Sequence, residues 1–387
     1  MNDEVWSRDM NIGLFGFSFE DRNKGCEALT YSFVSILNDL VPNNLTIINL
    51  SGIGEAKELQ KIFPKIKFEV TGFQRKKIGL NSFHELLKCD VVFDCTFGDN
   101  FSDIYSKSFA SKTTLLKELT LLLHKPLVLA PQTIGPFSDK QLIGRVKKVL
   151  KKCSRIYTRD ILSTEYVKEL SGVNAITVTD LAFLLPYDNQ SNLRNGKRVG
   201  INVSGLLWNG GFENNNQFEL SVDYQEYTRS IIQWLLNNSY DVYLIPHVND
   251  ENTDEIDEDY KICTQLAKEY DLPAPILYTT PIEVKSFISG MDFFIGSRMH
   301  STVAAFSSGV VTIPFSYSRK FEGLYHNLNY DYIIDGKTLS TEKAILETKG
   351  MIVKYKDMRS SQEKSMEKIK SLEDTFISSL IIYLESI

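Results

Sequence analysis

The sequence has few cysteines, and they follow no pattern. The five residues, Cys26, Cys89, Cys95, Cys153 and Cys263, are odd in number and scattered, with no CxxC spacing. Disulfide frameworks of secreted proteins and structural zinc sites need paired or closely spaced cysteines, so both classes are excluded. We therefore expect reduced thiols in a cytosolic protein.

Long hydrophobic runs are also lacking. No apolar stretch approaches the roughly 20 residues that a membrane-spanning helix needs. The N-terminal residues MNDEVWSRDM are charged and lack the apolar centre of a secretory signal. We therefore expect a protein that is made and kept in the cytoplasm.

A strongly basic domain, the usual mark of nucleic-acid-binding proteins, is missing as well. The formal net charge is -6 over 387 residues, with 43% hydrophobic and 24% charged residues. This composition is typical of a globular protein, and the acidic balance argues against a nucleic-acid partner. The length exceeds what one ordinary core accommodates and suits two domains.

Several signature motifs do not occur. There is no GxGxxG after the first predicted strand, no P-loop, no HExxH and no cluster with metal-ligand spacing. We therefore expect a metal-independent site without a bound cofactor.

Short β-rich runs alternate with amphipathic helical stretches along the chain. This alternation indicates βα units and a mainly parallel sheet with helices on both faces. Helices are predicted over 25–40, 108–124, 138–152 and 224–238. Strands are predicted over 11–17, 45–50, 90–95, 125–130, 154–158, 198–204, 241–246, 275–279, 292–296 and 310–315.

The alternation breaks over 187–197, where YDNQSNLRNGK is polar and rich in turn formers, and we take this stretch as a linker. We predict an α/β protein with two Rossmann-like, doubly wound domains, residues 10–190 and 198–350. A charged helical segment, 355–387, follows. The ligand is expected in a cleft between the domains, beyond the carboxyl ends of the strands.

The stretch GSRMHSTVAAFSSG begins at the end of the predicted strand 292–296 and contains a short helix of small residues. The N-terminus of such a helix offers free amide donors and the positive end of its dipole, which suits a small anion. Arg298 adds a planar guanidinium that matches phosphate or carboxylate, and His300 can transfer a proton near neutral pH. Ser297 and Ser301 flank this pair. In the alternative interpretation, Arg298 pairs with a carboxylate across domains and His300 caps the helix.

Three more polar positions follow strands in the second half. Lys320 begins the helix after strand 310–315; it is a second cation for a multiply charged anion or a solvated lysine. The loop 205–218 is rich in glycine and asparagine and carries Trp208. The indole suits a pyranose face, or else it is a buried anchor. His247, after strand 241–246, is a second acid–base candidate or a polar residue entering a turn.

In the first half, the loop after the first strand leads to Asn23 and Gly25, where the backbone can approach a ligand closely. After strand 90–95, Asp99 and Asp103 are spaced to share one rim. Two carboxylates favour a general base for a sugar hydroxyl, and the alternative is helix N-capping.

Further candidate ligand-binding residues of the first half also follow predicted strands: Gln132, Arg159 and Asp180.

The helix at 144–155, GRVKKVLKKCSR, carries six cations interleaved with apolar residues. Such a helix is compatible with peripheral contact at the inner face of a membrane. The alternative is a solvated helix face.

The chain resembles the polysaccharide pyruvyl transferases. The matching segments occur in family order and cover almost all of residues 11–325. They are NKGCEAL (23–29), FGDNFSD (97–103), APQTIGPF (130–137), TRDILS (158–163), TDLAFLLP (179–186), GINVSGLLWNGG (200–211), IPH (245–247) and GSRMHSTVAAFSSGVVTIPFSYSRKFEGL (296–324).

The resemblance implies a fold like that of the two-Rossmann-domain, GT-B-like glycosyltransferases. It implies phosphoenolpyruvate as donor and co-substrate, and a saccharide of a cell-surface polymer pathway as acceptor, free or lipid-linked. The product would be a pyruvate ketal. The arginine and histidine of the family's RxH motif serve the donor, which places Arg298 and His300 there. The N-terminal domain is then the acceptor side and the C-terminal domain the donor side.

The expected mechanism combines both sets of residues. Arg298 and Lys320, with helix amides near Ser301, hold the donor, and His300 protonates its methylene carbon. Asp99 or Asp103 orients or deprotonates an acceptor hydroxyl. The remaining candidates shape the saccharide or interdomain site, among them Trp208, Asn23 and Asp180.

Two departures from the family pattern concern the acceptor side. Many relatives carry Gly-Asp where this chain has Gly25-Cys26, and a run of glycines where it has Thr96-Phe97-Gly98. Two alternatives stay open: a nucleotide-sugar-dependent glycosyltransferase on a similar scaffold, and a non-catalytic relative that binds saccharide and scaffolds an assembly complex.

Overall fold

The computed structural model describes residues 9–41, 45–51, 54–70, 80–104, 106–211, 213, 215–250 and 255–387. Backbone contacts divide the chain into two compact units. Unit 1 comprises Met1–Asp21, Leu29–Leu184 and Lys370–Ile387, and unit 2 comprises Arg22–Ala28 and Leu185–Ile369. The short segment Arg22–Ala28 therefore groups with unit 2, although the sequence boundaries place it in the first domain.

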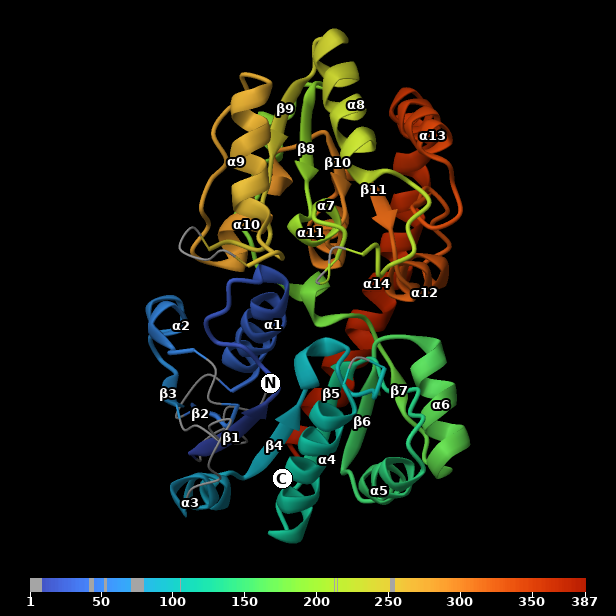
Figure 1. Cartoon of the computed structure of the whole chain (residues 1–387). Helices are drawn as coiled ribbons and strands as arrows, with labels where there is room; N and C mark the ends of the chain where they lie inside the picture. The colour runs from blue at the N-terminus through green and yellow to red at the C-terminus, as the bar shows by residue number, and fades with distance from the viewer. Residues whose placement is uncertain are drawn as a thin grey trace. The chain divides into compact units, whose positions relative to one another are not determined.

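Unit 1 is built on a seven-stranded parallel sheet (Figure 1). The strand order β3-β2-β1-β4-β5-β6-β7 extends the 3-2-1-4-5-6 order of Rossmann folds. All four residues of β4 and all six of β5 are buried, as expected for strands covered on both faces. The strands are β1 (Met10–Phe15), β2 (Leu45–Asn49), β3 (Lys67–Val70), β4 (Val91–Asp94), β5 (Leu127–Gln132), β6 (Arg155–Thr158) and β7 (Ile176–Thr177).

Helices cover both faces of this sheet. Figure 1 shows α4, α5 and α6 on one face and the C-terminal half of α14 on the other. Phe93 of β4 contacts Phe33 of α1 and Tyr383 of α14, at ring-centroid distances of 4.9 and 6.5 Å. The helices are α1 (Lys24–Leu40), α2 (Lys57–Ile62), α3 (Leu80–Lys88), α4 (Lys107–Leu122), α5 (Lys140–Leu150) and α6 (Ile161–Ser171).

Unit 2 contains a five-stranded parallel sheet in the order β12-β11-β10-β8-β9, which is the flavodoxin-like 2-1-3-4-5 order with the strands counted from β8. Its strands are β8 (Arg198–Asn202), β9 (Asp241–Leu244), β10 (Phe293–Gly296), β11 (Val311–Ser316) and β12 (Ile334–Asp335). The α/β fold class with two Rossmann-like sheets, predicted from the alternation, is confirmed.

The two faces of this second sheet carry separate cores. Phe293 and Ile295 point into a large core with α8, α9 and α13, whereas Phe294 packs with α10 and α11 on the other face. Successive side chains of a β-strand point to opposite faces of the sheet, which accounts for this alternation. The helices are α7 (Gly205–Trp208), α8 (Tyr224–Asn237), α9 (Asp259–Glu269), α10 (Pro281–Ser289), α11 (Met299–Ser307), α12 (Arg319–Asn327) and α13 (Thr341–Val353).

The last helix, α14 (Tyr355–Leu384), contributes residues up to Ile369 to unit 2 and the rest to unit 1. One strand prediction is wrong: 275–279 is not a strand, because Pro273 and Pro275 lack the backbone donor that a ladder requires. Within the described ranges, every helix is too short or too polar to cross a bilayer.

Candidate active site

The Arg298 guanidinium lies at the carboxyl end of β10, where Arg298 is the N-cap residue of α11. Its Nη2 donates to Asp259 Oδ1 at 2.7 Å and to Asp257 Oδ1 at 2.5 Å, and its Nε donates to Asp259 Oδ1 at 3.2 Å. Burial alone would lower the pKa of Arg298, but the charges of Asp259 and Asp257 outweigh it and raise the pKa. The arginine is therefore permanently charged and held in one orientation.

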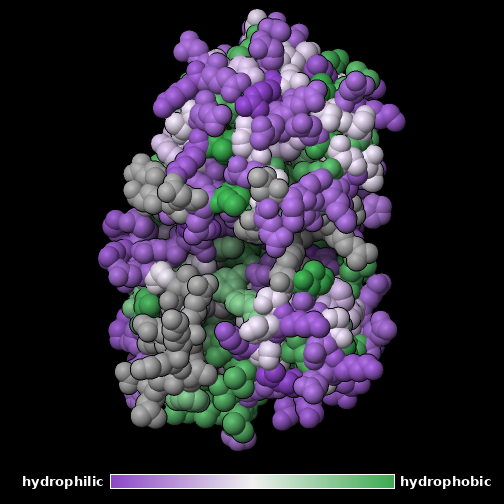
Figure 2. Space-filling view, viewed as in Figure 1, coloured by the Kyte–Doolittle hydropathy of each residue, from purple (hydrophilic) through white to green (hydrophobic). Residues whose placement is uncertain are grey.

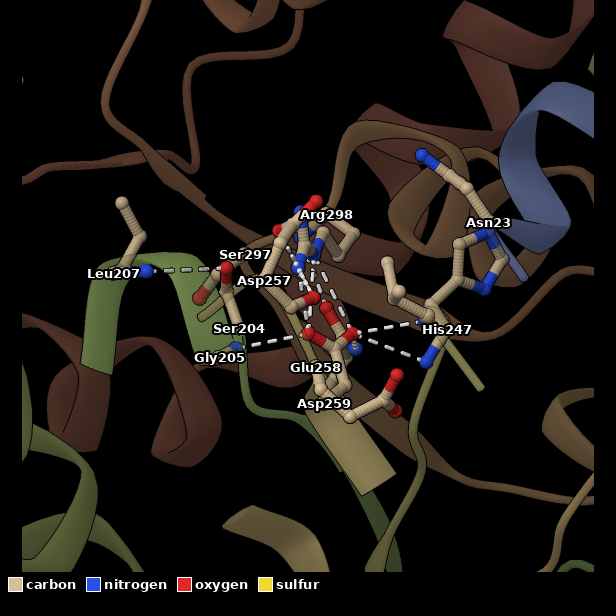
Figure 3. A network of polar contacts seen from close by, with 12 residues as sticks. Asn23, Ser204, Gly205, Leu207, His247, Asp257, Glu258, Asp259, Ser297 and Arg298 are labelled. Atoms are coloured by element: carbon tan, nitrogen blue, oxygen red, sulfur yellow. Dashed lines mark hydrogen bonds and ion pairs between the residues drawn. The ribbon is translucent and has the colours of Figure 1, made fainter. Parts of the chain in front are cut away.

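Asp259 organises this edge of the sheet (Figure 3). Its side chain is fully buried. Besides Arg298, it accepts from Gly205 N at 2.9 Å and from the backbone amides of His247 and Val248, each at 3.1 Å. These donors follow β8 and β9. One carboxylate thus joins the ends of three neighbouring strands, which fixes their loops relative to one another.

Asn202, the last residue of β8, completes the link. Its Oδ1 accepts from Arg298 N at 2.9 Å and from Ser301 Oγ at 3.1 Å. Its Nδ2 donates to Ile245 O at 3.0 Å and to Asp259 Oδ2 at 3.2 Å. All of its hydrogen-bonding capacity serves the scaffold. Ser301 is likewise buried, and its hydroxyl donates to Arg298 O at 2.7 Å, so its side chain supports α11.

His247 follows β9, and only 3% of it is exposed. Neither ring nitrogen has a hydrogen-bond partner among the described residues. Burial, followed by the nearby positive groups His300, Arg298 and Lys24, lowers the pKa of His247 well below its ordinary value. The imidazole therefore stays neutral at physiological pH, unlike a histidine that serves as a proton donor.

The segment before α1 lies beside both histidines. Lys24 N donates to His247 O at 3.0 Å, and Asn23 forms an isolated bridge with Val248. Asn23 Oδ1 accepts from Gly25 N at 3.0 Å and begins the helix. A Cβ on Gly25 would lie 2.4 Å from His300 Nδ1, so glycine is needed for this approach. Asn23, Gly25, His247, Arg298 and His300 thus come together within unit 2.

Ser297 lies at the same edge. Its hydroxyl is 2.7 Å from Tyr224 Oη, which in turn accepts from Ser204 N at 3.0 Å. Ser297 is buried, so the prediction places it in the right cluster, where it ties α8 to β10.

Glu258 precedes Asp259 and caps α9 by accepting from Tyr260 N at 2.9 Å. Burial raises the pKa of Glu258 to about 7, with a smaller contribution from the charge of Asp259. This carboxyl group therefore titrates near neutrality, at the point where α9 presents Asp259.

Trp208 is not the exposed sugar platform that was one interpretation of its loop. Only 7% of it is exposed, it belongs to the core of unit 2, and the Arg229 guanidinium lies 4.6 Å from its ring centre. The alternative, a buried anchor, is observed, because α7 packs the indole inward. A groove of about 790 Å³ lies beside it, also lined by Phe218, Asn216 and Asp223.

In unit 1, Arg159 and Asp180 form a buried ion pair with Nη1 2.7 Å from Oδ2. Arg159 Nε also donates to Thr133 Oγ1 at 2.9 Å. Burial would lower the pKa of Arg159, but Asp180 and then Asp99 and Asp160 raise it. The pair and the half-buried Asp99 therefore belong to one charged group at the carboxyl edge of this sheet.

Two predicted site residues of unit 1, Asp103 and Gln132, bind the surrounding scaffold. Asp103 Oδ2 accepts from Ser138 N at 2.7 Å, Ser138 Oγ at 3.0 Å and Asp139 N at 2.9 Å. Burial would raise the pKa of Asp103, but these bonds lower it, so Asp103 is a structural carboxylate rather than a base. Gln132 is fully buried, and its Nε2 donates to Asp94 O at 2.5 Å and Ala130 O at 3.2 Å. Its Oε1 is buried and has no hydrogen-bond partner among the described residues, so a ligand role for Gln132 stays a prediction.

Lys320 lies in the first turn of α12, and its side chain is outside the described part of the chain. The described residues contain no group of three or more histidine, cysteine or acidic side chains that could hold a metal ion. None of the five cysteines, all of which lie in the described ranges, forms a disulfide bond.

The sequence interpretation missed Asp257, Asp259 and Asn202. The signal was the acidic run DEIDED, residues 254–259, directly before a helix and soon after His247. Such runs usually form solvated surface, so only the fold reveals that Asp257 and Asp259 face an arginine 39 or more residues away.

The fold is similar to that of several solved structures. HepE from Anabaena, in complex with UDP, superposes with a TM-score of 0.57 at 11% identity and covers 98% of this chain and 100% of its own. A UDP-N-acetylglucosamine 2-epimerase gives a TM-score of 0.57 at 10% identity, with coverage of 95% and 96%. The UDP co-structure of MnaA from S. aureus gives 0.55 at 10% identity, with coverage of 92% and 91%. At these identities the likeness shows the fold alone, which is GT-B-like.

No curated protein matches the chain in a sequence search. The family model for polysaccharide pyruvyl transferase, however, matches residues 23–319. The match spans most of the chain and includes Asn23, the acidic residues Asp257 and Asp259, and the start of α11 at Arg298. The chain belongs to the polysaccharide pyruvyl transferase family.

Proposed function

We propose that the protein transfers pyruvate from phosphoenolpyruvate to a saccharide and forms a pyruvate ketal. The observation that carries this proposal is the orientation of Arg298 at the start of α11. The guanidinium is fixed by Asp259, and His300 is the second residue of the helix that Arg298 caps. The proposal combines this geometry with the family, whose members act on polysaccharide.

Two of the three guanidinium nitrogens of Arg298 already make hydrogen bonds. Nε and Nη2 of Arg298 bond to the acidic pair, whereas Nη1 makes no hydrogen bond among the described residues. Asp259 is fully buried, but the Asp257 side chain is 17% exposed. A phosphate or carboxylate of the donor can therefore bind Nη1 and compete with Asp257 for the outer edge of the guanidinium.

The transfer itself needs one proton at carbon. His300 donates a proton to the methylene carbon of phosphoenolpyruvate, and C2 becomes cationic. An acceptor hydroxyl bonds to C2 and loses its proton. A second hydroxyl then displaces phosphate from C2 and closes the ketal. Each new C–O bond is matched by one hydroxyl proton released, one C–O bond to phosphate breaks, and no redox partner is required.

For the acceptor we propose Asp99 as the base, assisted by the Arg159–Asp180 pair. Asp99 is half-buried and, with Asp180, raises the pKa of Arg159, whereas Asp103 Oδ2 accepts from Ser138 and Asp139. A carboxylate in reach of a hydroxyl is the usual partner for such a proton transfer.

The acceptor is further proposed to be lipid-linked and reached by peripheral contact with an anionic membrane surface. Lys147, Lys148, Lys151 and Lys152 are all exposed at the C-terminal end of α5. α4 packs beside α5, and Leu122 at its end is 70% exposed. Figure 2 shows hydrophobic side chains gathered over the lower end of α4. Basic and apolar side chains at one edge are typical of interfacial binding.

The first test is calorimetric titration of the full chain with phosphoenolpyruvate. Wild type is expected to bind, and Arg298→Ala to lose at least about tenfold in affinity. Arg198→Ala is the matched control, because Arg198 begins β8 at the opposite edge of the same sheet. Thermal melts of both variants establish that they are folded.

Turnover separates binding from chemistry. His300→Gln is expected to bind phosphoenolpyruvate and to lose turnover. Retained turnover would refute its role as the acid. Binding of UDP-sugars in place of phosphoenolpyruvate would overturn the proposal in favour of glycosyl transfer.

A further inference from the structure

Three consecutive residues after β4 adopt left-handed backbone conformations. Their φ angles are 42° at Thr96, 56° at Phe97 and 86° at Gly98. Only glycine adopts this region without cost, and a β-branched or bulky residue there is an outlier. Strained residues of this kind persist when the surroundings fix them, and they concentrate at functional sites.

A buried polar network fixes the segment. Lys117 Nζ of α4 lies 2.9 Å from Asp94 Oδ2 and donates to Thr96 Oγ1 at 2.8 Å. Thr96 Oγ1 donates to Asp94 Oδ1 at 2.5 Å. Lys117 is fully buried, and its ammonium lies 4.0 Å from the ring centre of Phe101. A lysine is rarely buried so completely unless it is paired. Here the pairing of Lys117 with Asp94 and Thr96 holds the turn in its conformation.

Thr96 and Gly98 are buried, but the ring of Phe97 is not part of the core. The Phe97 ring is half-buried and lies outside the buried core of the unit. Its neighbour is Phe109 in the first turn of α4, with ring centroids 6.1 Å apart, and Phe109 is 37% exposed. The conformation presents an aromatic pair at the carboxyl edge of the sheet.

Polar groups flank this pair. A Cβ on Gly98 would lie 3.1 Å from Arg159 Nη1, so the turn passes directly over the guanidinium. Asp99 follows in sequence and is half-buried. An aromatic face beside a carboxylate and a guanidinium suits a sugar ring, whose C–H face packs on aromatic carbon while its hydroxyls bond to charged groups.

We infer that Phe97, with Phe109, is the stacking platform for the pyranose ring of the acceptor. Thr96 and Lys117 position this platform. The inference rests on the proposed function for the identity of the ligand as an acceptor, but not for the presence of a sugar site in unit 1.

Saturation-transfer NMR on the full chain tests the platform without turnover. The probes are the methyl β-D-pyranosides of galactose, glucose and mannose. We expect at least one to bind wild type, and Phe97→Gly to weaken it by about tenfold. Phe97→Tyr, which keeps the aromatic face, is expected to retain binding. Because glycine relieves the strain at φ 56°, the melting temperature of Phe97→Gly should be unchanged or higher.

His124→Gly is the matched control. His124 also has a φ of 56°, but it follows the C-terminal end of α4 at the other edge of the unit. It should gain stability without any loss of pyranoside binding. Binding that survives in Phe97→Gly, or the absence of binding to all three probes in wild type, would overturn the platform.

Titration with phosphoenolpyruvate tests the donor site at Arg298 separately from the sugar platform at Phe97. Phe97→Gly should bind this donor as wild type does. If wild type bound pyranosides through Phe97 but failed to bind phosphoenolpyruvate, the platform would stand and the donor assignment would fall.

Discussion

Arg298 and Asp259 form a buried pair in which one carboxylate fixes the guanidinium through Nη2 at 2.7 Å and Nε at 3.2 Å. The same carboxylate accepts three backbone amides from two other strand ends. The charge of Arg298 is thus part of the scaffold. In the function we propose, the donor binds the free edge of the same guanidinium, so donor binding and the folding of unit 2 would be coupled through this pair.

Removing the charge of Asp259 should be costly. Asp259→Asn leaves Arg298 without its fully buried partner, and breaking a buried pair costs about 3–5 kcal/mol. We expect a fall in unfolding free energy of that size and loss of phosphoenolpyruvate binding. Urea denaturation and calorimetry measure the two effects. A variant as stable as wild type would contradict the central role of this carboxylate.

Asp257 should behave in the opposite way. Its carboxylate contacts the outer edge of Arg298 from a partly exposed position. If it competes with the donor anion, Asp257→Asn removes a negative charge from the binding edge, and phosphoenolpyruvate affinity should rise by about three- to tenfold. Calorimetry at low salt gives the clearest comparison with wild type. Weaker binding would mean that Asp257 helps to hold the arginine rather than competing for it.

Gly25 is expected to set the position of His300. In Gly25→Ala the added methyl would overlap the imidazole, which lies as near as 2.4 Å, so the ring must move. Turnover should fall by about tenfold or more, because small misplacements of a catalytic group are expensive, while phosphoenolpyruvate still binds through Arg298. Steady-state kinetics combined with titration separates these effects.

The control for this variant is Gly350→Ala. Gly350 also lies inside a helix, α13, but a Cβ there meets nothing within 4 Å. Alanine should raise stability by about 0.5–1 kcal/mol and leave turnover unchanged. Equal kinetic effects in the two variants would show that Gly25 has no special relation to His300.

The fold was predictable because its signal is local. Buried strands such as β4 and β5 are continuous apolar runs, and the helices between them are amphipathic, so the alternation alone indicates two parallel sheets. The wrong strand prediction at 275–279 also came from a local signal, which long-range structure did not support. Ile276, Leu277 and Tyr278 have strand propensity, but two prolines and exposure of Ile276 and Leu277 leave no ladder to join.

The site was only partly predictable, because its organising contacts are long-range. Position after a strand correctly brings Ser297, Arg298 and His247 to one edge. It does not reveal that Asp103 binds the backbone before α5, whereas Asp99 belongs to the charged group of Arg159 and Asp180. Nor does it reveal Asp259, whose role depends on strand order and on contacts with residues between 11 and 57 positions away. Trp208 was also ambiguous, because the composition of its loop does not show whether the indole is buried in the core or exposed to solvent.

Membrane contact through α5 is tested by vesicle sedimentation. Wild type should bind vesicles of phosphatidylglycerol and phosphatidylcholine more strongly than vesicles of phosphatidylcholine alone. Changing Lys147, Lys148, Lys151 and Lys152 to glutamine should weaken binding by about 1 kcal/mol per residue. Turnover on a soluble acceptor should not change. Equal binding by the variant would assign the lysines to an ordinary solvated face.

Glu258 should make the stability of the protein depend on pH near neutrality. Its pKa is raised from an ordinary value of 4.5 to about 7, mainly by burial. Between these two values the folded state holds a proton that the unfolded state has lost. The unfolding free energy therefore falls as pH rises through this window, by at most about 3 kcal/mol. Above pH 7 the full destabilisation by the buried, ionised Glu258 is present, and below pH 4.5 this destabilisation vanishes.

Glu258→Gln isolates this contribution. The amide oxygen can still cap α9, but it does not titrate. The pKa of His247 is lowered, so His247 makes the unfolding free energy rise with pH. This effect is the same in wild type and variant and cancels when their unfolding free energies are subtracted. We expect the variant to gain stability over wild type as pH rises from 5 to 8, and to match it at pH 4.5. Urea denaturation across this range measures the difference. A constant difference at every pH would show that Glu258 ionises in the folded state as it does in the unfolded chain.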